Sequence, residues 1–258
     1  MNLKTTNHSH PHRVAVAWFA ALVAWAWLAD AAPASAATTE RTTPGRAEVR
    51  AMTGSAVWST NGGPVMPLKV GTVLFSGTTV ITATNSTVDL FLGRSAGVVR
   101  VAESSTLSLD SLKLINTGAD TKVEVQLELP DGEMYFNVNK LSKASRYEIK
   151  MPTGVAGIRG TKGNFNARPN STKPRILLLE GTVILAHTTP SGQMVTLTMK
   201  APPPVTFEPS EGVKEAAPAA VTVAVAQVDS ATKSAPSPPQ APPPKTTTQP
   251  VEPVLSQH

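Results

Sequence analysis

The chain has 258 residues, no cysteine, 16% charged residues, 23 prolines and a formal net charge of +5. The lack of cysteine excludes a disulfide scaffold, thiolate metal sites and thiol nucleophiles. Because much of the proline lies near the C-terminus, a body of about 150 residues remains, which is long enough to bury one hydrophobic core.

Residues 1–36 have the three-part layout of a secretory signal peptide. A polar, basic start precedes an uninterrupted apolar run over residues 14–29, and Pro33 and Ala34-Ser35-Ala36 follow it. This arrangement predicts cleavage after Ala36 and therefore a periplasmic or other extracytoplasmic location in the cell envelope. The run is shorter than the ~20 residues that span a bilayer. An uncleaved membrane anchor is therefore the second choice, and membrane contact is expected only in that case.

The next part of the chain predicts one all-β domain. Residues 37–46 are rich in Thr and Arg and are predicted to be disordered. From residue 47 to about residue 200 apolar and polar residues alternate, as in Val123, Val125 and Leu127. Such alternation gives each strand one buried and one solvated face. Gly, Pro and Asn turn signals separate the runs, which predicts a single β-sandwich or roll, or a short β-solenoid.

Residues 201–258 are predicted to form a disordered Pro/Ala-rich tail. They hold thirteen of the 23 prolines and, apart from Phe207, no aromatic residue. Such a composition buries too little apolar surface to offset the entropy of ordering. No segment after the leader shows a 3.6-residue apolar stripe, so no helix is expected. The one apolar patch, residues 219–228, leaves open a transient strand or a partner-docking segment.

Basic residues concentrate between Lys140 and Arg175, where nine of them accompany one acid, Glu148. Such a cluster can attract an anionic polymer or surface, although solvent-facing strand and loop positions are the simpler explanation. Nucleic acid is not expected as a partner, because the leader would place the domain outside the cell.

The residues give no sign of catalytic chemistry. His187 is the single histidine of the body and is expected on the surface, and the aspartates lack the spacing of metal ligands. The sequence thus predicts no catalytic, metal or cofactor site, and the chain is predicted not to be an enzyme. Glu124, Glu128 and Glu133 leave one alternative, a two-carboxylate enzyme that acts on envelope carbohydrate.

Five motifs in a fixed order resemble the FecR-domain family. They are Gly54–Val57, Leu68–Thr82, Gly132–Phe136, Ile158–Thr161 and Glu180–Val183. The resemblance covers most of residues 47–200 and implies an exported all-β module. The family-motif residues, for which structural roles are expected, are Gly71, Gly77, Gly132, Ile158, Arg159, Gly160, Thr161, Glu180 and Gly181. For Arg159 we expect a partner among buried acids or backbone carbonyls near its turn.

The resemblance also bounds the function. The family's eponymous members carry a cytoplasmic anti-sigma region before a membrane helix and relay signals from an outer-membrane receptor, whereas only thirteen residues precede the apolar run here. We therefore expect an exported protein without that region, a non-enzymatic binding, scaffold or signal-sensing module whose partner is an envelope protein or an anionic envelope polymer. The alternatives are a membrane-tethered regulator of transmembrane signalling and the carbohydrate-active enzyme named above.

Overall fold

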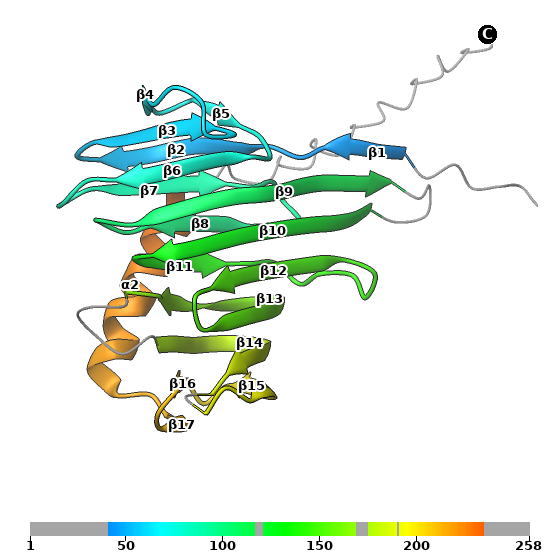
Figure 1. Ribbon diagram of the computed structural model, residues 1–258, viewed down its shortest axis with the longest axis vertical. Helices are drawn as coiled ribbons and strands as arrows, with labels where there is room; N and C mark the ends of the chain where they lie inside the picture. The colour runs from blue at the N-terminus through cyan, green and yellow to red at the C-terminus, as the bar shows by residue number, and fades with distance from the viewer. Residues whose placement is uncertain (1–40, 117–120, 169–174, 190, 235–258) are drawn as a thin grey trace, which may run out of the picture. The chain divides into compact units, whose positions relative to one another are not determined.

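The computed structural model describes residues 41–116, 121–168, 175–189 and 191–234 (Figure 1). The predicted leader, with its cleavage site at Ala36, and the tail from residue 235 lie outside the described residues. Among the described residues no helix is long and apolar enough to cross a membrane.

These residues form seventeen strands and one helix. The strands are β1 (Arg41–Pro44), β2 (Ala47–Thr53), β3 (Ala56–Thr60), β4 (Met66–Pro67), β5 (Val73–Leu74), β6 (Thr78–Thr82), β7 (Thr87–Phe91), β8 (Val98–Val101), β9 (Thr106–Asn116), β10 (Thr121–Asp131), β11 (Glu133–Asn137), β12 (Arg146–Met151), β13 (Gly154–Asn166), β14 (Arg175–Thr188), β15 (Met194–Ala201), β16 (Val205–Glu208) and β17 (Gly212–Glu215). The helix is α2 (Pro218–Ser234). The prediction of an all-β domain is confirmed for the body of the chain.

One sheet curls back on itself and encloses the core between two layers. Layer A has the order β17, β16, β14, β13, β11, β8, β7, β2, β5. Layer B has the order β15, β14, β13, β12, β10, β9, β6, β3, β4, and β1 pairs with the far end of β9. All of these pairs are antiparallel except β10 with β12. Strands β13 and β14 belong to both layers, so they form the fold's corner.

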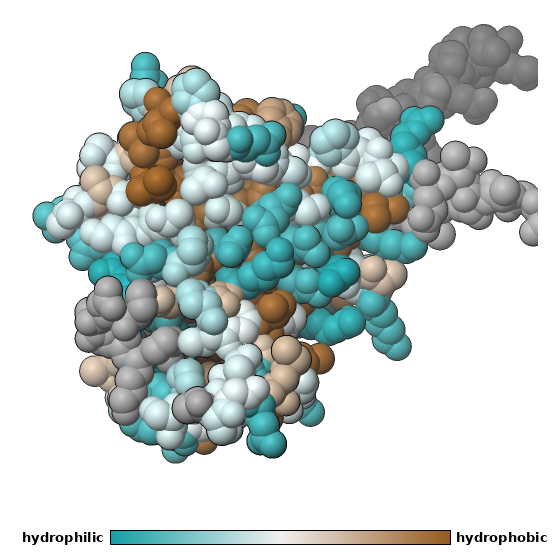
Figure 2. Space-filling view, in the orientation of Figure 1, coloured by the Kyte–Doolittle hydropathy of each residue, from teal (hydrophilic) through white to brown (hydrophobic). Residues whose placement is uncertain are grey.

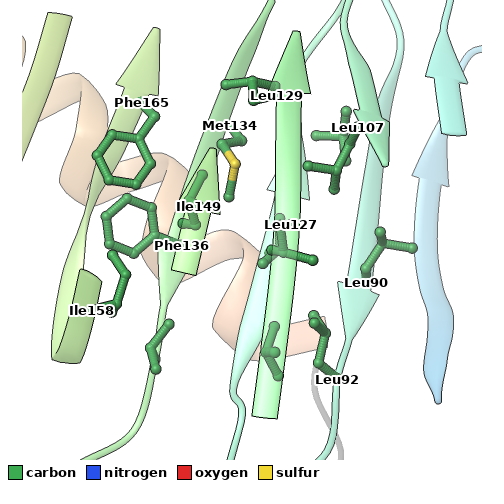
Figure 3. Close-up of a cluster of buried hydrophobic side chains, with 14 of the residues drawn as sticks. Leu90, Leu92, Leu107, Leu127, Leu129, Met134, Phe136, Ile149, Ile158 and Phe165 are labelled. Atoms are coloured by element: carbon green, nitrogen blue, oxygen red, sulfur yellow. The ribbon is translucent and has the colours of Figure 1, made fainter. Parts of the chain in front are cut away.

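Side chains from both layers meet in one hydrophobic core (Figure 3). Phe136 from β11 stacks on Phe165 from β13, with ring centroids 4.7 Å apart. Leu127 from β10 and Ile149 from β12, both fully buried, lie in the same cluster. The alternating positions that the sequence marks as apolar are therefore the positions that face inward.

Strands β13 and β14 change layers by breaking their register. The first part of β13 pairs with β12, and its last part pairs with β11. Between Arg159 and Gly163 the pairing with β14 shifts twice. An irregularity of this kind bends a strand and increases its twist, which lets one long strand serve both layers.

The prediction of a disordered tail from residue 201 was wrong as far as residue 234. Strand β16 pairs with the first part of β14, and Phe207 is buried beside Ile176. Helix α2 then lies on the outer face of layer A, where it contacts β8, β11, β13 and β14 (Figure 1). Ala224 and Val228 of the helix pack on Tyr135 and Leu177 of the sheet. Tertiary packing of this kind, rather than intrinsic propensity, stabilises most protein helices.

The predicted disordered segment 37–46 also contains a strand. β1 pairs with β9, with Arg41 opposite Asn116 and Pro44 opposite Lys113. Its short, polar sequence has no alternating pattern and therefore does not predict a strand. The pairing is possible because β9 extends beyond its partner β6.

Candidate functional site

The two strongest family motifs lie together at the corner. Gly160 and Gly181 have φ values of +64° and +94°, which favour glycine. The neighbouring side chains of Ile158 and Thr161 are 2% and 1% exposed. Lys162 and Glu180 close the corner with a 2.6 Å ion pair. In this position the motif residues shape the turn of the sheet.

The remaining motif glycines lie far from Arg159 and close other turns. The amide of Gly77 donates to the carbonyl of Leu109 at 2.7 Å, and that of Gly71 donates to the carbonyl of Val49 at 2.8 Å. The carbonyl of Gly132 accepts from the amide of Ala167 at 2.8 Å. The structure therefore does not gather all the motif residues into one site.

Three of the nine basic residues between Lys140 and Arg175 are paired with acids, namely Arg146, Lys150 and Lys162. Arg146 makes two hydrogen bonds to Glu148, of 2.6 and 3.0 Å. Lys150 donates to Asp110 at 2.9 Å, and this hydrogen bond raises the lysine pKa. Because Asp110 and Glu180 come from outside residues 140–175, a count along the sequence overstates the local positive charge.

Arg159 and Glu180 are motif residues with exposed side chains, but Glu180 is held by its ion pair with Lys162. Among the described residues the guanidinium of Arg159 makes one hydrogen bond, a long one of 3.4 Å from Nη1 to the carbonyl of Lys143. The expected backbone-carbonyl partner is thus present, but this contact leaves most of the five N–H donors of the guanidinium for other partners.

A hollow of about 290 Å³ lies beside Arg159 on the outer face of layer B. We call it the Arg159 notch, and its principal lining residues are Arg146, Glu148, Val155, Gly157, Arg159 and Ile184. Gly157 forms its floor, because this residue lies between Glu148 of β12 and Ile184 of β14 and has no side chain. Val155 and Ile184 flank it with 38% and 44% of their surface exposed.

The surroundings of the notch are polar. Figure 2 shows a polar band over β9, β10 and β12, with a smaller hydrophobic area next to it. Lys200 of β15 is opposite Thr182, which is itself opposite Arg159. Arg159 and the exposed Lys200 therefore lie in one row across three strands. The arrangement offers cationic donors next to apolar surface.

A second hollow, of about 390 Å³, lies between layer A and α2. Tyr135 donates to Glu133 at 3.2 Å within it, and Asn164 donates to the same carboxylate at 2.9 Å. Burial and the neighbouring Glu133 raise the pKa of Tyr135. Arg168 and Gln227 complete this polar lining. The groups present can form hydrogen bonds to a polar ligand.

Helix α2 covers an ion pair next to this second hollow. Arg100 binds Asp89 through two hydrogen bonds, of 2.6 and 2.8 Å, and donates a third to Gln227 of α2 at 2.9 Å. The side chains of Arg100 and Asp89 are only 11% and 2% exposed. The sequence alone does not predict this ion pair, because it forms where the register of β7 and β8 places Asp89 opposite Arg100.

The carboxylates considered for glycan cleavage are separated. Glu124 and Glu128 lie on the outer face of layer B, and Glu124 binds Lys113 at 3.2 Å. Glu133 lies instead in the hollow on layer A. His187 was wrongly expected on the surface, because it is 6% exposed and packs edge-on against Phe207. Within the described parts of the chain, no group of three or more His, Cys, Asp or Glu side chains has the placement of a metal site.

Residues 78–184 match the family model described as "FecR protein". Over this segment the chain is similar to the FecR family. The match takes in less than half of the chain and is narrower than the 47–200 expected, but it includes the corner and the Arg159 notch. β15, β16, β17 and α2 follow the matched FecR segment. No curated protein matches the chain.

Two solved structures resemble the chain. Both are crystal structures described as "a putative anti-sigma factor from Parabacteroides distasonis ATCC 8503", at 1.65 and 2.50 Å resolution. Each is 13% identical over 57% of this chain, with TM-scores of 0.43 and 0.42. The alignments span 64% and 63% of those chains.

Proposed function

We propose that this FecR-domain protein is a non-enzymatic binding module of the bacterial cell envelope that serves signal sensing. The family match supports a signalling-related role, and the leader pattern supports export to the periplasm. Its partner is an envelope protein or an anionic envelope polymer. The Arg159 notch favours the anionic polymer.

The observation that carries this proposal is the exposed guanidinium of Arg159 beside the floor of Gly157. Arg146 is already engaged by Glu148, whereas Arg159 has only its long contact to Lys143. A guanidinium binds carboxylate and phosphate oxygens through paired hydrogen bonds. Arg159 therefore offers more N–H donors to an anionic group than Arg146 does.

The neighbouring residues extend the same preference. Lys143 and Lys200 are exposed near Arg159, whereas Glu148 is held by Arg146. Val155 and Ile184 add apolar surface on which the backbone of a polymer can lie. The bound chemistry is thus a repeated carboxylate or phosphate on a chain that also has apolar atoms.

Binding to defined polymers tests this proposal. Fluorescence anisotropy would compare labelled poly(glycerol phosphate), poly-L-glutamate and neutral dextran with residues 37–258. We expect binding to the two anionic polymers that weakens from 50 to 300 mM salt, because screening lengths shorten over this range. Arg159→Gln should weaken binding about threefold to tenfold, as expected for the loss of about 1 kcal/mol of charge-assisted hydrogen bonding.

Arg94→Gln is the matched control, because Arg94 is also exposed but lies at the β7–β8 turn. It should leave the affinity within a factor of two. Equal binding by Arg159→Gln and the parent would reject the notch as the site, and equal binding of dextran would reject the anionic polymer. Sequencing the N-terminus of the exported protein separates a released module from a tethered regulator, since a start at residue 37 removes the apolar run.

A further inference from the structure

Strand β15 is a long edge strand of layer B. Among the described strands it pairs with β14 alone, from Met194 opposite Thr188 to Ala201 opposite Gly181. Its eight residues, Met-Val-Thr-Leu-Thr-Met-Lys-Ala, contain no proline and a single charge at Lys200. Such a strand presents unpaired amides and carbonyls to another strand.

The other edges among the described strands are better protected. β4 and β5 have two residues each, and β4 ends in Pro67. β1 has four residues and ends in Pro44. β17 also has four, of which Lys214 and Glu215 are charged. Short length, proline and charge are the usual means by which proteins block edge pairing, and β15 has none of them over its first six residues.

The two faces of β15 differ in polarity. Val195, Leu197 and Met199 point toward the core side, where Met199 is 1% exposed, Leu197 is half-buried and Val195 is 38% exposed. Thr196, Thr198 and Lys200 are exposed on the outer face. The exposed fraction of the apolar side chains thus increases from Met199 through Leu197 to Val195.

We propose that β15 pairs antiparallel with β15 of a second copy of this chain. A two-fold axis perpendicular to the sheet at Leu197 keeps the core side of one copy continuous with the core side of the other. Leu197 then lies opposite Leu197 of the second copy, Val195 opposite Met199, and Thr196 opposite Thr198. Lys200 lies opposite Met194, so no like charges face each other.

A self-complementary sequence favours a second copy over an unrelated strand. Directly opposed side chains stabilise antiparallel pairs when apolar residues meet apolar residues and hydroxyls meet hydroxyls. Both conditions hold for this register from Val195 to Met199. Two-fold dimers with the same patch on both subunits are also the commonest assemblies of soluble proteins. An interface of one edge strand falls below the ~1,200 Å² of standard complexes, so the dimer is expected to be weak and concentration-dependent.

The dimer does not depend on the proposed binding of an anionic polymer, but it would affect it. Since the axis is perpendicular to the sheet, both Arg159 notches would lie on one continuous outer face. Five strand spacings of about 4.8 Å separate β13 of one copy from β13 of the other. Two notches about 24 Å apart would therefore bind one polymer chain together.

Sedimentation velocity of residues 37–258 from 5 μM to 1 mM tests this pairing, because the described residues between 41 and 234 belong to one compact unit. A charge swap at Thr196 and Thr198 gives the decisive comparison. We expect the parent to dimerise with rising concentration, whereas T196K/T198K and T196E/T198E should each have a dissociation constant raised at least tenfold. An equimolar mixture should recover dimers, since each Lys would then lie opposite a Glu. Native mass spectrometry identifies them as heterodimers.

Both variants should keep the circular dichroism spectrum and melting temperature of the parent within about 2–3 °C, as expected for exposed strand positions. A parent that stays monomeric at 1 mM would overturn the proposal. So would dimers that both variants form as readily as the parent, or a mixture that forms none. In the last case the edge would fit an unrelated strand rather than a second copy.

Discussion

Gly181 lies against Gly160 so closely that a Cβ on residue 181 would be 2.2 Å from the carbonyl oxygen of Gly160. That oxygen belongs to the backbone of β13, so it cannot move without shifting the strand. The φ of Gly181, +94°, is also one that side chains rarely allow. The two motifs are therefore one structural device, at the point where β13 and β14 leave layer B for layer A.

Gly181→Ala should lower the free energy of unfolding by about 3 kcal/mol, since it combines backbone strain with a clash that cannot relax locally. Urea denaturation followed by circular dichroism measures this loss. Gly212→Ala is the control, because Gly212 has a similar φ of +78° and no atom lies within 4 Å of the position that its Cβ would take. It should lower the same quantity by only about 1 kcal/mol. Equal losses would show that contact with Gly160 is unimportant.

Removing one member of the Asp89–Arg100 pair should be costly. Asp89→Ala leaves a guanidinium buried under α2 without its carboxylate, and breaking a buried pair in this way destabilises by about 3–5 kcal/mol. The double variant Asp89→Leu/Arg100→Leu should recover most of that loss, because no charge then remains buried. Urea denaturation of the two variants and the parent measures both effects.

Glu48→Ala gives the comparison for Asp89→Ala. Glu48 and Arg50 also form an ion pair, of 2.7 Å, but their side chains are 27% and 31% exposed. Surface pairs contribute about 0–1 kcal/mol. A loss for Asp89→Ala no larger than that for Glu48→Ala would mean that α2 does not seal the pair from water.

The sequence predicted the parts of the fold that depend on local pattern. Alternation at Val123, Val125 and Leu127 predicted inward-facing strand residues, and these are buried. Alternation does not predict where β13 and β14 pass from layer B to layer A, because that point depends on the register between the two strands. The motif order marked Gly160 and Gly181, but only the structure brings them into contact.

The candidate site was predictable only in fragments. Arg159 belongs both to a motif and to the basic stretch, so the sequence singled it out twice. Its neighbours Ile184 and Lys200 come from later strands and carried no signal. The helix was missed for another reason. Residues 219–228 are nearly all Ala and Val, so no polar face marks a 3.6-residue stripe, and the helix is stabilised by packing on layer A.

Val228→Ala tests whether α2 contributes to stability as part of the fold. Val228 is 2% exposed and packs on the face that carries Tyr135 and Leu177. Loss of its two methyl groups should lower the free energy of unfolding by about 1–2 kcal/mol. Val223→Ala is the matched control on the same helix, where Val223 is 56% exposed. It should change the same quantity by less than about 0.5 kcal/mol, and equal effects would place the helix off the sheet.

Tyr147 predicts how the stability depends on pH. Its ring lies in the core, its hydroxyl has no hydrogen-bond partner among the described residues, and burial raises its pKa. In the unfolded chain a tyrosine ionises at about pH 10. In the folded chain Tyr147 stays neutral to higher pH. The unfolded state therefore loses protons first, so stability is retained below about pH 10 and falls as the pH rises above it.

Tyr147→Phe should remove this part of the alkaline loss and raise the free energy of unfolding at pH 7 by about 1 kcal/mol, because no buried hydroxyl is left unsatisfied. Urea midpoints at pH 7, 9, 10 and 11 measure both effects. Tyr135→Phe separates the two causes, since Tyr135 also has a raised pKa but donates to Glu133. It should reduce the alkaline loss yet lower stability at pH 7, because Glu133 loses a donor. A parent and a Tyr147→Phe variant with parallel pH profiles above pH 10 would show that water reaches the Tyr147 hydroxyl.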